Sequence, residues 1–367
     1  MMETLAAGTE ARGLPAAIGH TPLVSLDLGA PSGTRIYAKL ESVNPGGSIK
    51  DRPVVRMLTE AVRAGRFATG RRLLDSSSGN AGISYAMLGA ALGVPITIVV
   101  PGNASRERLD RIVAHGAELI MTDPLKGYDF ALDEAKRLAA EYPEPYWYCD
   151  QYRNPDNWRA HYAGTGTEIL AQIAAETGAL PDAFVAGVGT GGTLTGAGRR
   201  LKEANPNLHI LAVIPERFPG IEGLKPLGQP GDIVPAILDE GLIDERTEVT
   251  SEEAAAMCAR LAHLGLFVGP SSGAFAAGAL RLAATGRYRT IVTVLSDTGE
   301  RYGSTGMAAG GDVLTRPKLQ LPRWLLARHQ VVVARAYSMG SAASDSNRLR
   351  SSSAACFALW MRAVSSW

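Results

Sequence analysis

The feature that most constrains the fold of this chain is a regular alternation of short apolar runs with longer helix-forming runs. The short runs are expected to be strands and lie at 20–24, 35–40, 72–75, 96–100, 117–121, 146–150, 183–187, 210–215 and 290–295. The longer runs are expected to be helices and lie at 54–64, 80–92, 105–115, 128–141, 164–176, 194–204 and 251–264. Strands that alternate with helices at this spacing pair in parallel, and the helices cover the sheet. The sequence therefore predicts an α/β protein built from two such series.

Two segments fall outside the alternation. Residues 216–239 are rich in glycine and proline, which indicates a long functional loop. From residue 316 onward eight Lys and Arg stand against one acid, Asp345, so this segment carries +7 and residues 1–315 carry −6 of the net charge of +1. The serine-rich composition of 316–367 predicts disorder. A basic tail that binds a partner or a membrane surface is the alternative.

The composition excludes several classes of protein. An acidic body offers no general attraction for nucleic acid. The three cysteines, Cys149, Cys258 and Cys356, form no CxxC or Cys/His cluster, so we expect reduced thiols and no metal site. No run of about 18 apolar residues could cross a membrane, and residues 1–14 lack the apolar centre of a signal peptide. We therefore expect a cytoplasmic protein without a nucleic-acid or membrane partner.

Lys50 stands where a glycine-bearing turn meets the start of a helix, in the segment NPGGSIKDRP at 44–53. Pro45 and the glycine pair end the preceding strand, and Ser48 is expected to cap the helix. A lysine in such a place is ordinarily a solvated charge or an ion-pair partner of a neighbouring acid such as Glu41 or Asp51.

Two further stretches favour a reactive amine at this position. They are SSGN at 77–80 and GVGTGGT at 187–193, each at the end of an expected strand. A buried amine, a serine/asparagine loop and a glycine loop that cradles phosphate are together what a pyridoxal phosphate enzyme needs.

The glycine loop alone permits two interpretations. Backbone N–H groups, two threonine hydroxyls and the positive end of the next helix are the ingredients of a phosphate site. Gly187, Gly189 and Gly192 also spell G-x-G-x-x-G after a strand, and Glu216 closes the next strand, which imitates a dinucleotide fingerprint. Taken alone, this favours a nicotinamide enzyme. The serine/asparagine loop and the setting of Lys50 reverse the choice, because a nicotinamide enzyme needs neither.

The three motifs resemble the cysteine synthase (O-acetylserine or O-phosphoserine sulfhydrylase) family of the fold type II pyridoxal phosphate enzymes, from about residue 16 to about residue 306. The resemblance implies two doubly wound open-sheet α/β domains of the tryptophan synthase β-like kind. The larger, cofactor-binding domain would comprise 16–51 and 159–312, and the smaller, mobile domain 52–158. Nothing in the family resembles 316–367.

The resemblance also assigns the cofactor site. Lys50 would bind pyridoxal 5′-phosphate covalently and then move the substrate's Cα proton. Asn80 would hydrogen-bond the ring hydroxyl, and Ser271 would face the pyridine nitrogen, although Ser271 or Ser272 could instead cap a helix. The 5′-phosphate would be held by Gly189, Thr190, Gly191, Gly192 and Thr193.

The substrate carboxylate would be held by the loop of Ser77, Ser78 and Gly79 and by Gln151. The alternatives without a role in binding are that the loop only caps a helix and that Gln151 lies in a solvated loop. Ala81 departs from the family pattern, which has threonine there, so one hydroxyl is lost. The segment 296–302 would lie behind the residues that touch ligands.

The implied reaction is β-replacement on an activated L-serine: the β-substituent leaves, and sulfide or a sulfide donor adds to the resulting aminoacrylate to give L-cysteine. Whether the leaving group is acetate or phosphate stays open. His161-Tyr162 and the cationic loop 217–225 resemble the phosphoserine-using members, and Arg217 or Lys225 would meet an anionic leaving group. A solvated loop charge is the alternative.

Other functions stay open at this point. Cystathionine β-synthase, diaminopropionate synthases and serine/threonine dehydratases share the fold. An NAD-dependent oxidoreductase or a catalytically silent binding protein would come from other classes. Family members are homodimers, and the resemblance extends that expectation to this chain.

Overall fold

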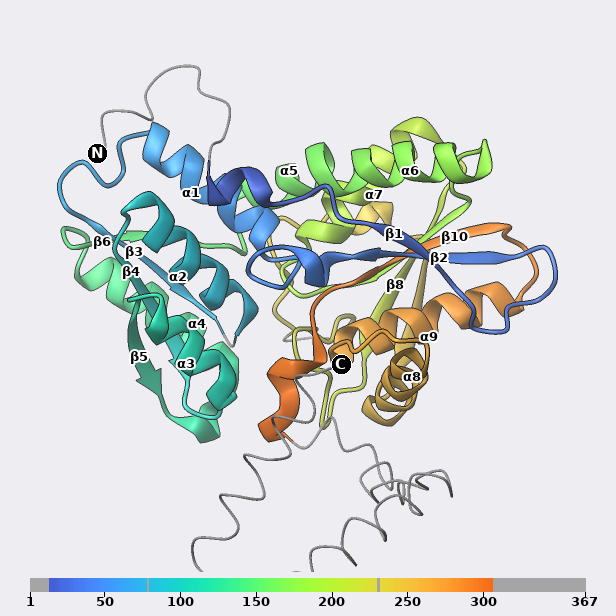
Figure 1. The fold of residues 1–367 in the computed structure, drawn as a ribbon. Coiled ribbons are helices and arrows are strands. Elements are labelled where there is room, and N and C mark those ends of the chain that lie inside the picture. Colours follow the sequence, from blue (N-terminus) through green and yellow to red (C-terminus); the bar gives the residue numbers. More distant parts are fainter. Residues whose placement is uncertain (1–12, 78, 230–231, 306–367) are drawn as a thin grey trace, which may run out of the picture. The chain divides into compact units, whose positions relative to one another are not determined.

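The computed structural model of the protein describes residues 13–77, 79–229 and 232–305 and contains two separate sheets (Figure 1). The larger sheet has six strands in the order β1-β2-β10-β7-β8-β9, and the smaller has four in the order β5-β4-β3-β6. All neighbours pair in parallel except β1 and β2. The predicted α/β fold with parallel sheets is confirmed. The predicted tail at 316–367 lies outside the described residues.

The strands of the larger sheet come from both ends of the described chain. They are β1 (Leu23–Leu26), β2 (Arg35–Leu40), β7 (Ala183–Gly187), β8 (His209–Pro215), β9 (Glu245–Val249) and β10 (Thr290–Leu295). Strands β7, β8 and β10 are buried almost throughout, as expected for the interior of a parallel sheet. The edge strand β9 escaped the prediction because its sequence ERTEV is charged and mostly exposed, so it lacks an apolar run.

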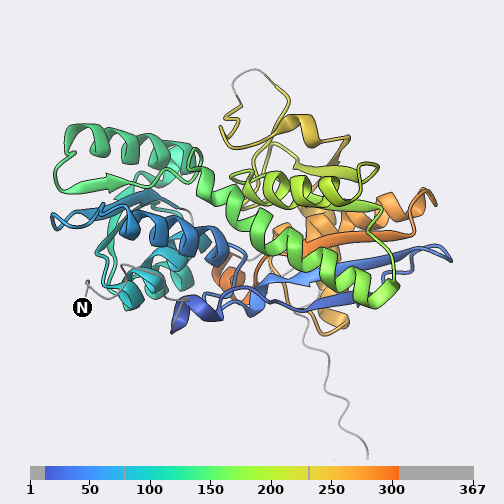
Figure 2. The ribbon, with the colours of Figure 1, turned by 90° about the horizontal axis from the view of Figure 1, so that it is seen from above.

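Helices cover both faces of the larger sheet (Figures 1 and 2). One face carries α6 (Thr167–Thr177) and α7 (Gly192–Ala204), and the other carries α8 (Ser251–His263) and α9 (Pro270–Ala284). A capping box formed by Thr250 and Glu253 starts α8.

The smaller sheet contains β3 (Arg72–Ser76), β4 (Ile96–Pro101), β5 (Glu118–Thr122) and β6 (Tyr146–Tyr148). Successive side chains along its strands point to opposite faces of the sheet and belong to two separate cores. Leu73 and Ile98 pack with helices α1 (Asp51–Arg63) and α2 (Asn80–Leu92), whereas Leu74 and Val99 pack with α4 (Gly127–Glu141). The remaining elements are α3 (Arg106–Ala114), α5 (Pro155–Ala160), the 3-10 turns Leu14–Ala17, Glu41–Val43, Pro124–Lys126 and Glu240–Leu242, and η7 (Gly299–Thr305).

The expected helix at 164–176 is longer in the structure. Helix α5, a π-helical turn at His161–Gly166 and α6 follow one another without a break. Two glycines that read as helix breakers lie in this π turn, but Gly166 packs on α7: a Cβ there would lie 3.2 Å from Ala197 Cα. Packing of this kind overrides local propensity.

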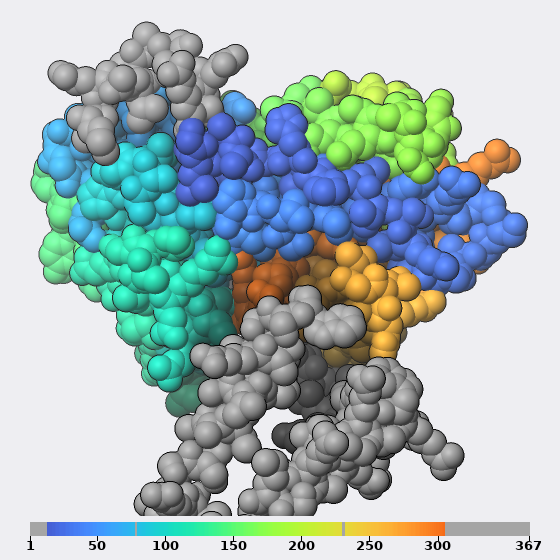
Figure 3. Space-filling view, in the orientation of Figure 1, coloured from blue at the N-terminus to red at the C-terminus, as the bar shows by residue number. Residues whose placement is uncertain are grey.

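Ser48, which was expected to cap a helix, and Ser105, which directly precedes one, make other contacts. Ser48 Oγ accepts the Lys50 N–H at 3.3 Å, and α1 begins directly after Lys50. Ser105 precedes α3, but its hydroxyl donates to the Arg301 carbonyl at 3.0 Å. This bond ties α3 to η7, the orange segment that lies beside the teal surface in Figure 3.

Each sheet has one place where the strand order reverses. In the smaller sheet, β4 and β6 flank β3, and in the larger sheet, β8 and β10 flank β7. Connections leave such a place in opposite directions, so a crevice forms at the carboxyl ends of the strands there. The loops that follow β3 and β7 are the predicted serine/asparagine and glycine loops.

A buried ionic network fixes the start of α1 to the larger sheet. Arg52 donates to Glu41 at 2.6 and 2.9 Å and to Glu168 at 2.7 and 2.8 Å, and Lys39 pairs with Glu168 at 2.7 Å. Lys39 and Glu41 are completely buried. Burial opposes the ionisation of Glu168, but the hydrogen bonds and charge of Arg52 outweigh it and lower the Glu168 pKa.

We predict that Glu168→Gln destabilises the protein by about 3–5 kcal/mol at pH 7, because two buried cations lose a charged partner. Since the folded-state pKa of Glu168 is lowered, this contribution is complete at neutral pH and is lost as the pH falls below about 4.5. Urea unfolding of both proteins at pH 7 and pH 4 measures it. Glu60→Gln, which breaks the exposed pair with Arg63, is the control and should cost less than about 1 kcal/mol. Equal losses for the two variants would contradict the prediction.

Candidate active site

The amine of Lys50 faces the glycine loop. Lys50 directly precedes α1, and its Nζ lies 3.9 Å from the position that a Cβ on Gly189 would occupy. Part of the side chain is exposed, yet protein atoms surround the amine closely enough that burial lowers its pKa, against the opposing charge of Asp297. A lowered pKa favours the neutral amine, which is the form that attacks a carbonyl.

The backbone before Lys50 is held by the residues that follow β10. Ile49 N–H donates to the Ser296 carbonyl at 2.8 Å, and Ser48 forms an isolated β-bridge with Asp297. Arg301 donates to the Gly46 carbonyl. The lysine is therefore positioned by a segment almost 250 residues away in the chain.

The glycine loop between β7 and α7 has the features expected of an anion cradle. Gly191, the residue before α7, has a φ of 84°, a conformation that glycine adopts without strain. The first N–H groups of α7 have no partner within the helix and point toward the loop, where the positive end of the helix favours an anion. Thr193 Oγ1 lies 3.4 Å from His161 Nε2, and burial lowers the His161 pKa, so this histidine is neutral.

Asn80 and Ser271 each start a helix beside this region. Asn80 Nδ2 donates to Asp297 Oδ2 at 2.6 Å, and its Oδ1 accepts from Arg301. Ser271 is the second residue of α9. The neighbouring Ser272 hydroxyl accepts the Ser296 N–H at 2.8 Å, which leaves Ser271 as the serine available to a ligand.

The serine loop and Gln151 meet at the carboxyl ends of β3 and β6. Gln151 Nε2 donates to the Ser76 carbonyl at 2.8 Å. Ser77 Oγ accepts the N–H groups of Gly79 and Gly82 at 3.0 and 2.8 Å, so this hydroxyl does cap the start of α2. Ser78 lies outside the described residues.

The two predicted cations of the long loop lie in different surroundings. Arg217 forms an exposed ion pair with Asp232 at 2.9 Å. Lys225 is mostly buried: its N–H donates to Val188 at 2.7 Å, and its Nζ lies 5.3 and 5.6 Å from the ring centres of Tyr128 and Tyr152. It also pairs with Asp129 of α4 at 2.6 Å.

Sequence reasoning missed Asn157, which connects the two halves of the site. Its Nδ2 donates to the Gln151 carbonyl at 2.7 Å and to Thr190 Oγ1 at 3.1 Å. Its Oδ1 is buried without a hydrogen-bond partner among the described residues, and so is Asp297 Oδ1. The segment 155–160 gave no signal because it reads as a loop after a proline.

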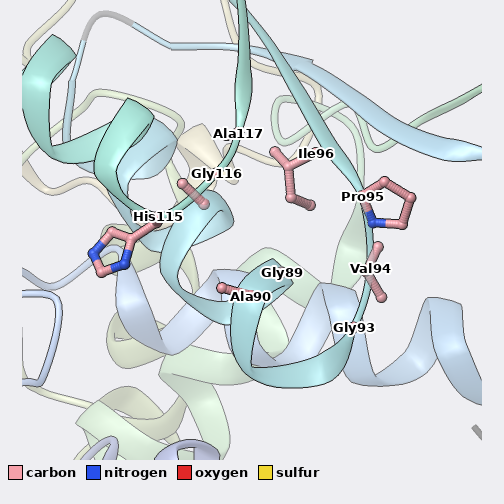
Figure 4. A pocket seen from close by; sticks show the side chains of 10 residues that line it. Gly89, Ala90, Gly93, Val94, Pro95, Ile96, His115, Gly116 and Ala117 are labelled. Carbon is pink, nitrogen blue, oxygen red and sulfur yellow. The ribbon is translucent and has the colours of Figure 1, made fainter. Parts of the chain in front are cut away.

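A hollow of about 320 Å³ lies elsewhere, at the amino end of β4 (Figure 4). Small and apolar residues of the end of α2 and the start of β4 line it, together with His115. It contains none of the predicted site residues. Within residues 13–77, 79–229 and 232–305, no helix has the length and apolarity to cross a membrane, and no cluster of His, Cys, Asp or Glu could hold a metal ion.

Two open parallel sheets, an enclosed amine and an anion cradle between strand ends define an α/β enzyme of the kind that anchors a phosphorylated aldehyde cofactor on a lysine. The model of the family "Pyridoxal-phosphate dependent enzyme" matches residues 14–297. The chain belongs to this family and, by the relatives described next, to its cysteine synthase branch. Its cofactor is pyridoxal 5′-phosphate, and the predicted family and cofactor are confirmed.

Three relatives illustrate the similarity. Cysteine synthase of Aquifex aeolicus is 45% identical over 305 residues, which cover 80% of this chain and 91% of that protein. The structure of O-ureido-L-serine synthase has a TM-score of 0.75 and 34% identity, covering 87% of this chain and all of that one. The structure of O-acetylserine sulfhydrylase isoform 3 from Entamoeba histolytica has a TM-score of 0.72 and 32% identity, covering 82% and 92%.

We predict that Gly189→Ala weakens binding of pyridoxal 5′-phosphate by about tenfold or more. A Cβ at this position would lie 2.5 Å from the Gly223 carbonyl oxygen, so one wall of the cradle must move. Titration of the cofactor-free protein, followed by visible absorbance, measures the affinity. Gly241→Ala is the control, because its Cβ would meet only the flexible Asp239 side chain at 3.3 Å. Unchanged affinity in the Gly189 variant would contradict the cradle assignment.

Proposed function

We propose that the protein is a cysteine synthase, which replaces the β-substituent of an activated L-serine by sulfide or a sulfide donor to give L-cysteine. The observation that carries this proposal is the amine of Lys50, which lies beside the glycine loop at Gly189 and whose pKa is lowered by burial. The cysteine synthase and O-acetylserine sulfhydrylase relatives support the same reaction.

The chemistry of the donor groups fits pyridoxal 5′-phosphate. Two buried acceptors, Asn157 Oδ1 and Asp297 Oδ1, have no hydrogen-bond partner among the described residues. Asn157 Oδ1 borders the glycine loop, because a Cβ on Gly192 would clash with it. In this proposal the cofactor is held by Lys50, Asn80, Gly189, Thr190, Gly191, Gly192, Thr193 and Ser271. When bound, the cofactor supplies the electron sink that stabilises negative charge at the substrate's Cα.

The residues of the chain supply positioning and proton transfer. The loop of Ser77, Ser78 and Gly79 and the side chain of Gln151 orient the substrate carboxylate, through donors other than the N–H groups of Ser77 and Gly79, which are bound to the Val99 carbonyl and to Ser77 Oγ. Lys50 Nζ takes the Cα proton and later returns it, which needs an amine with a lowered pKa. The Ser271 hydroxyl would hold the pyridine nitrogen more weakly than a carboxylate, which favours prompt loss of the β-substituent.

We expect Lys50→Ala to lower kcat by about a hundredfold or more, because the group that moves the proton is gone. In the wild type, borohydride reduction should attach the cofactor to the peptide that contains residue 50, as measured by mass spectrometry. Lys126→Ala, at the exposed surface, should react like the wild type. Cofactor attached to another lysine, with none at residue 50, would overturn the proposal.

The serine substrate of this reaction carries either acetate or phosphate as its leaving group. We propose O-phospho-L-serine as a substrate and Lys225 as the cation that meets its phosphate. Lys225 borders both the glycine loop, through Val188, and the Gln151 loop, through Tyr152. Each cation already has an acidic partner, Asp129 for Lys225 and Asp232 for Arg217, so its position beside the two loops is what favours Lys225. Arg217, the other predicted contact, is tested in parallel.

Lys225→Met is expected to lower kcat/KM for O-phosphoserine by about tenfold or more, since a partly buried cation on a phosphate contributes more than about 1.4 kcal/mol. The value for O-acetylserine should change less than about threefold. Arg217→Ala is the matched control and should change neither. A greater loss in the Arg217 variant would transfer the role to Arg217, and equal losses on both donors would remove the leaving-group assignment.

A second function is another β-replacement with a different acceptor, which the similarity to O-ureido-L-serine synthase favours. Competition between sulfide and homocysteine or other nucleophiles separates these activities. We further propose, from the family resemblance, a cytoplasmic homodimer in which residues 52–158 form a mobile smaller domain. Sedimentation velocity tests the dimer.

A further inference from the structure

Asp75 is a completely buried carboxylate between the two loops assigned to the substrate carboxylate. It is the fourth residue of β3, two residues before Ser77. Its Oδ1 accepts the N–H of Ser76 at 2.8 Å, and its Oδ2 accepts the N–H of Gln151 at 3.2 Å. The Tyr85 hydroxyl of α2 donates to Oδ2 at 2.7 Å. One rigid group thus touches the ends of both β3 and β6.

The bonds around Asp75 form a closed ring. Asp75 binds the N–H groups of Ser76 and Gln151, and Gln151 Nε2 donates back to the Ser76 carbonyl at 2.8 Å. The Asp75 carboxylate therefore fixes the distance between the serine loop and the Gln151 side chain.

The Asp75 carboxyl forms no ion pair with a cation among the described residues. The titratable groups that face it are Tyr85 from α2, Tyr128 from α4, and Tyr148, Cys149, Asp150 and Tyr152 from the end of β6 and the loop after it. Burial accordingly raises the Asp75 pKa to about 7. An apolar residue would be less costly in this core, which points to a role beyond packing.

We propose that Asp75 is a positioning residue for the substrate: it sets the register between the serine loop and Gln151 so that both reach one carboxylate. This inference rests on the proposed function, because it concerns the same substrate site. Asp75 is shielded from ligands and acts only through the two loops.

Asp75→Asn tests the inference. The amide keeps one acceptor oxygen but presents N–H groups to one of the two backbone N–H donors, so one loop loses its partner. The expected result is a KM for the serine donor raised about tenfold, which is the loss of one hydrogen bond to a charged group. The kcat, the KM for sulfide and cofactor affinity should each change less than about twofold.

Tyr85→Phe is the matched control. It removes the third hydrogen bond to Asp75 and leaves both loop bonds in place, so the donor KM should stay within about twofold of the wild type. Asp75→Glu keeps the charge but moves the carboxylate by one methylene, and a smaller, donor-specific rise in KM is expected. If the Asn variant does not fold, the Glu variant decides.

Donor binding can also be followed without turnover, from the cofactor absorbance on titration with L-serine. If the wild type binds no amino acid, the proposed function fails. If the wild type binds L-serine and the Asn and Glu variants bind it equally well, the Asp75 inference alone fails. Equal rises in the KM for donor and sulfide, or a matching effect in Tyr85→Phe, would reduce Asp75 to a structural residue.

Discussion

The short pairing between the residues before Lys50 and those after β10 is the interaction on which the site depends. An amine can be kept neutral only where protein atoms displace water, and a flexible lysine stays there only if its backbone is fixed. The Ile49 to Ser296 hydrogen bond and the Ser48 to Asp297 bridge provide this fixation. The same segment binds Asn80 through Asp297, so the amine and the first residue of α2 share one support.

Unsatisfied polar atoms indicate where the fold has been arranged for a ligand. A buried acceptor without a hydrogen bond costs about 1–3 kcal/mol, and within the described part of the chain Asn157 Oδ1 and Asp297 Oδ1 are both in this state. Both atoms belong to side chains whose other polar ends hold loops of the site. A fold selected for stability alone would replace them with apolar groups, so their presence is consistent with a partner that arrives with the cofactor.

Local sequence patterns predicted most of the helices and strands, but they did not predict which distant residues contact one another. Strands β2 and β7 and helix α2 have the predicted bounds, because each has a clear apolar period or a glycine boundary. The charged edge strand β9 and helix α5 lack such a period and were missed. The resemblance gave Lys50 and the glycine loop, but Asp75 and Asn157 owe their roles to contacts with strand ends and loops that lie tens of residues away, and no short motif carries that information.

The proposed site needs hydrogen-bond donors for an anion at one strand end of each sheet, and the two sheets provide them in different ways. At the end of β7 the helix start offers backbone N–H groups directly to an anion, and glycine keeps the surface open. At the end of β3 the N–H groups of Ser76 and Gln151 are already bound to Asp75 and cannot serve a substrate. The Ser77 N–H donates to the Val99 carbonyl and the Gly79 N–H to Ser77 Oγ, so these two are occupied as well. In the proposed site an arriving carboxylate therefore uses the second amide hydrogen of Gln151, since the first is donated to Ser76. Asp75 thus decides which donors face the substrate by occupying the ones that do not.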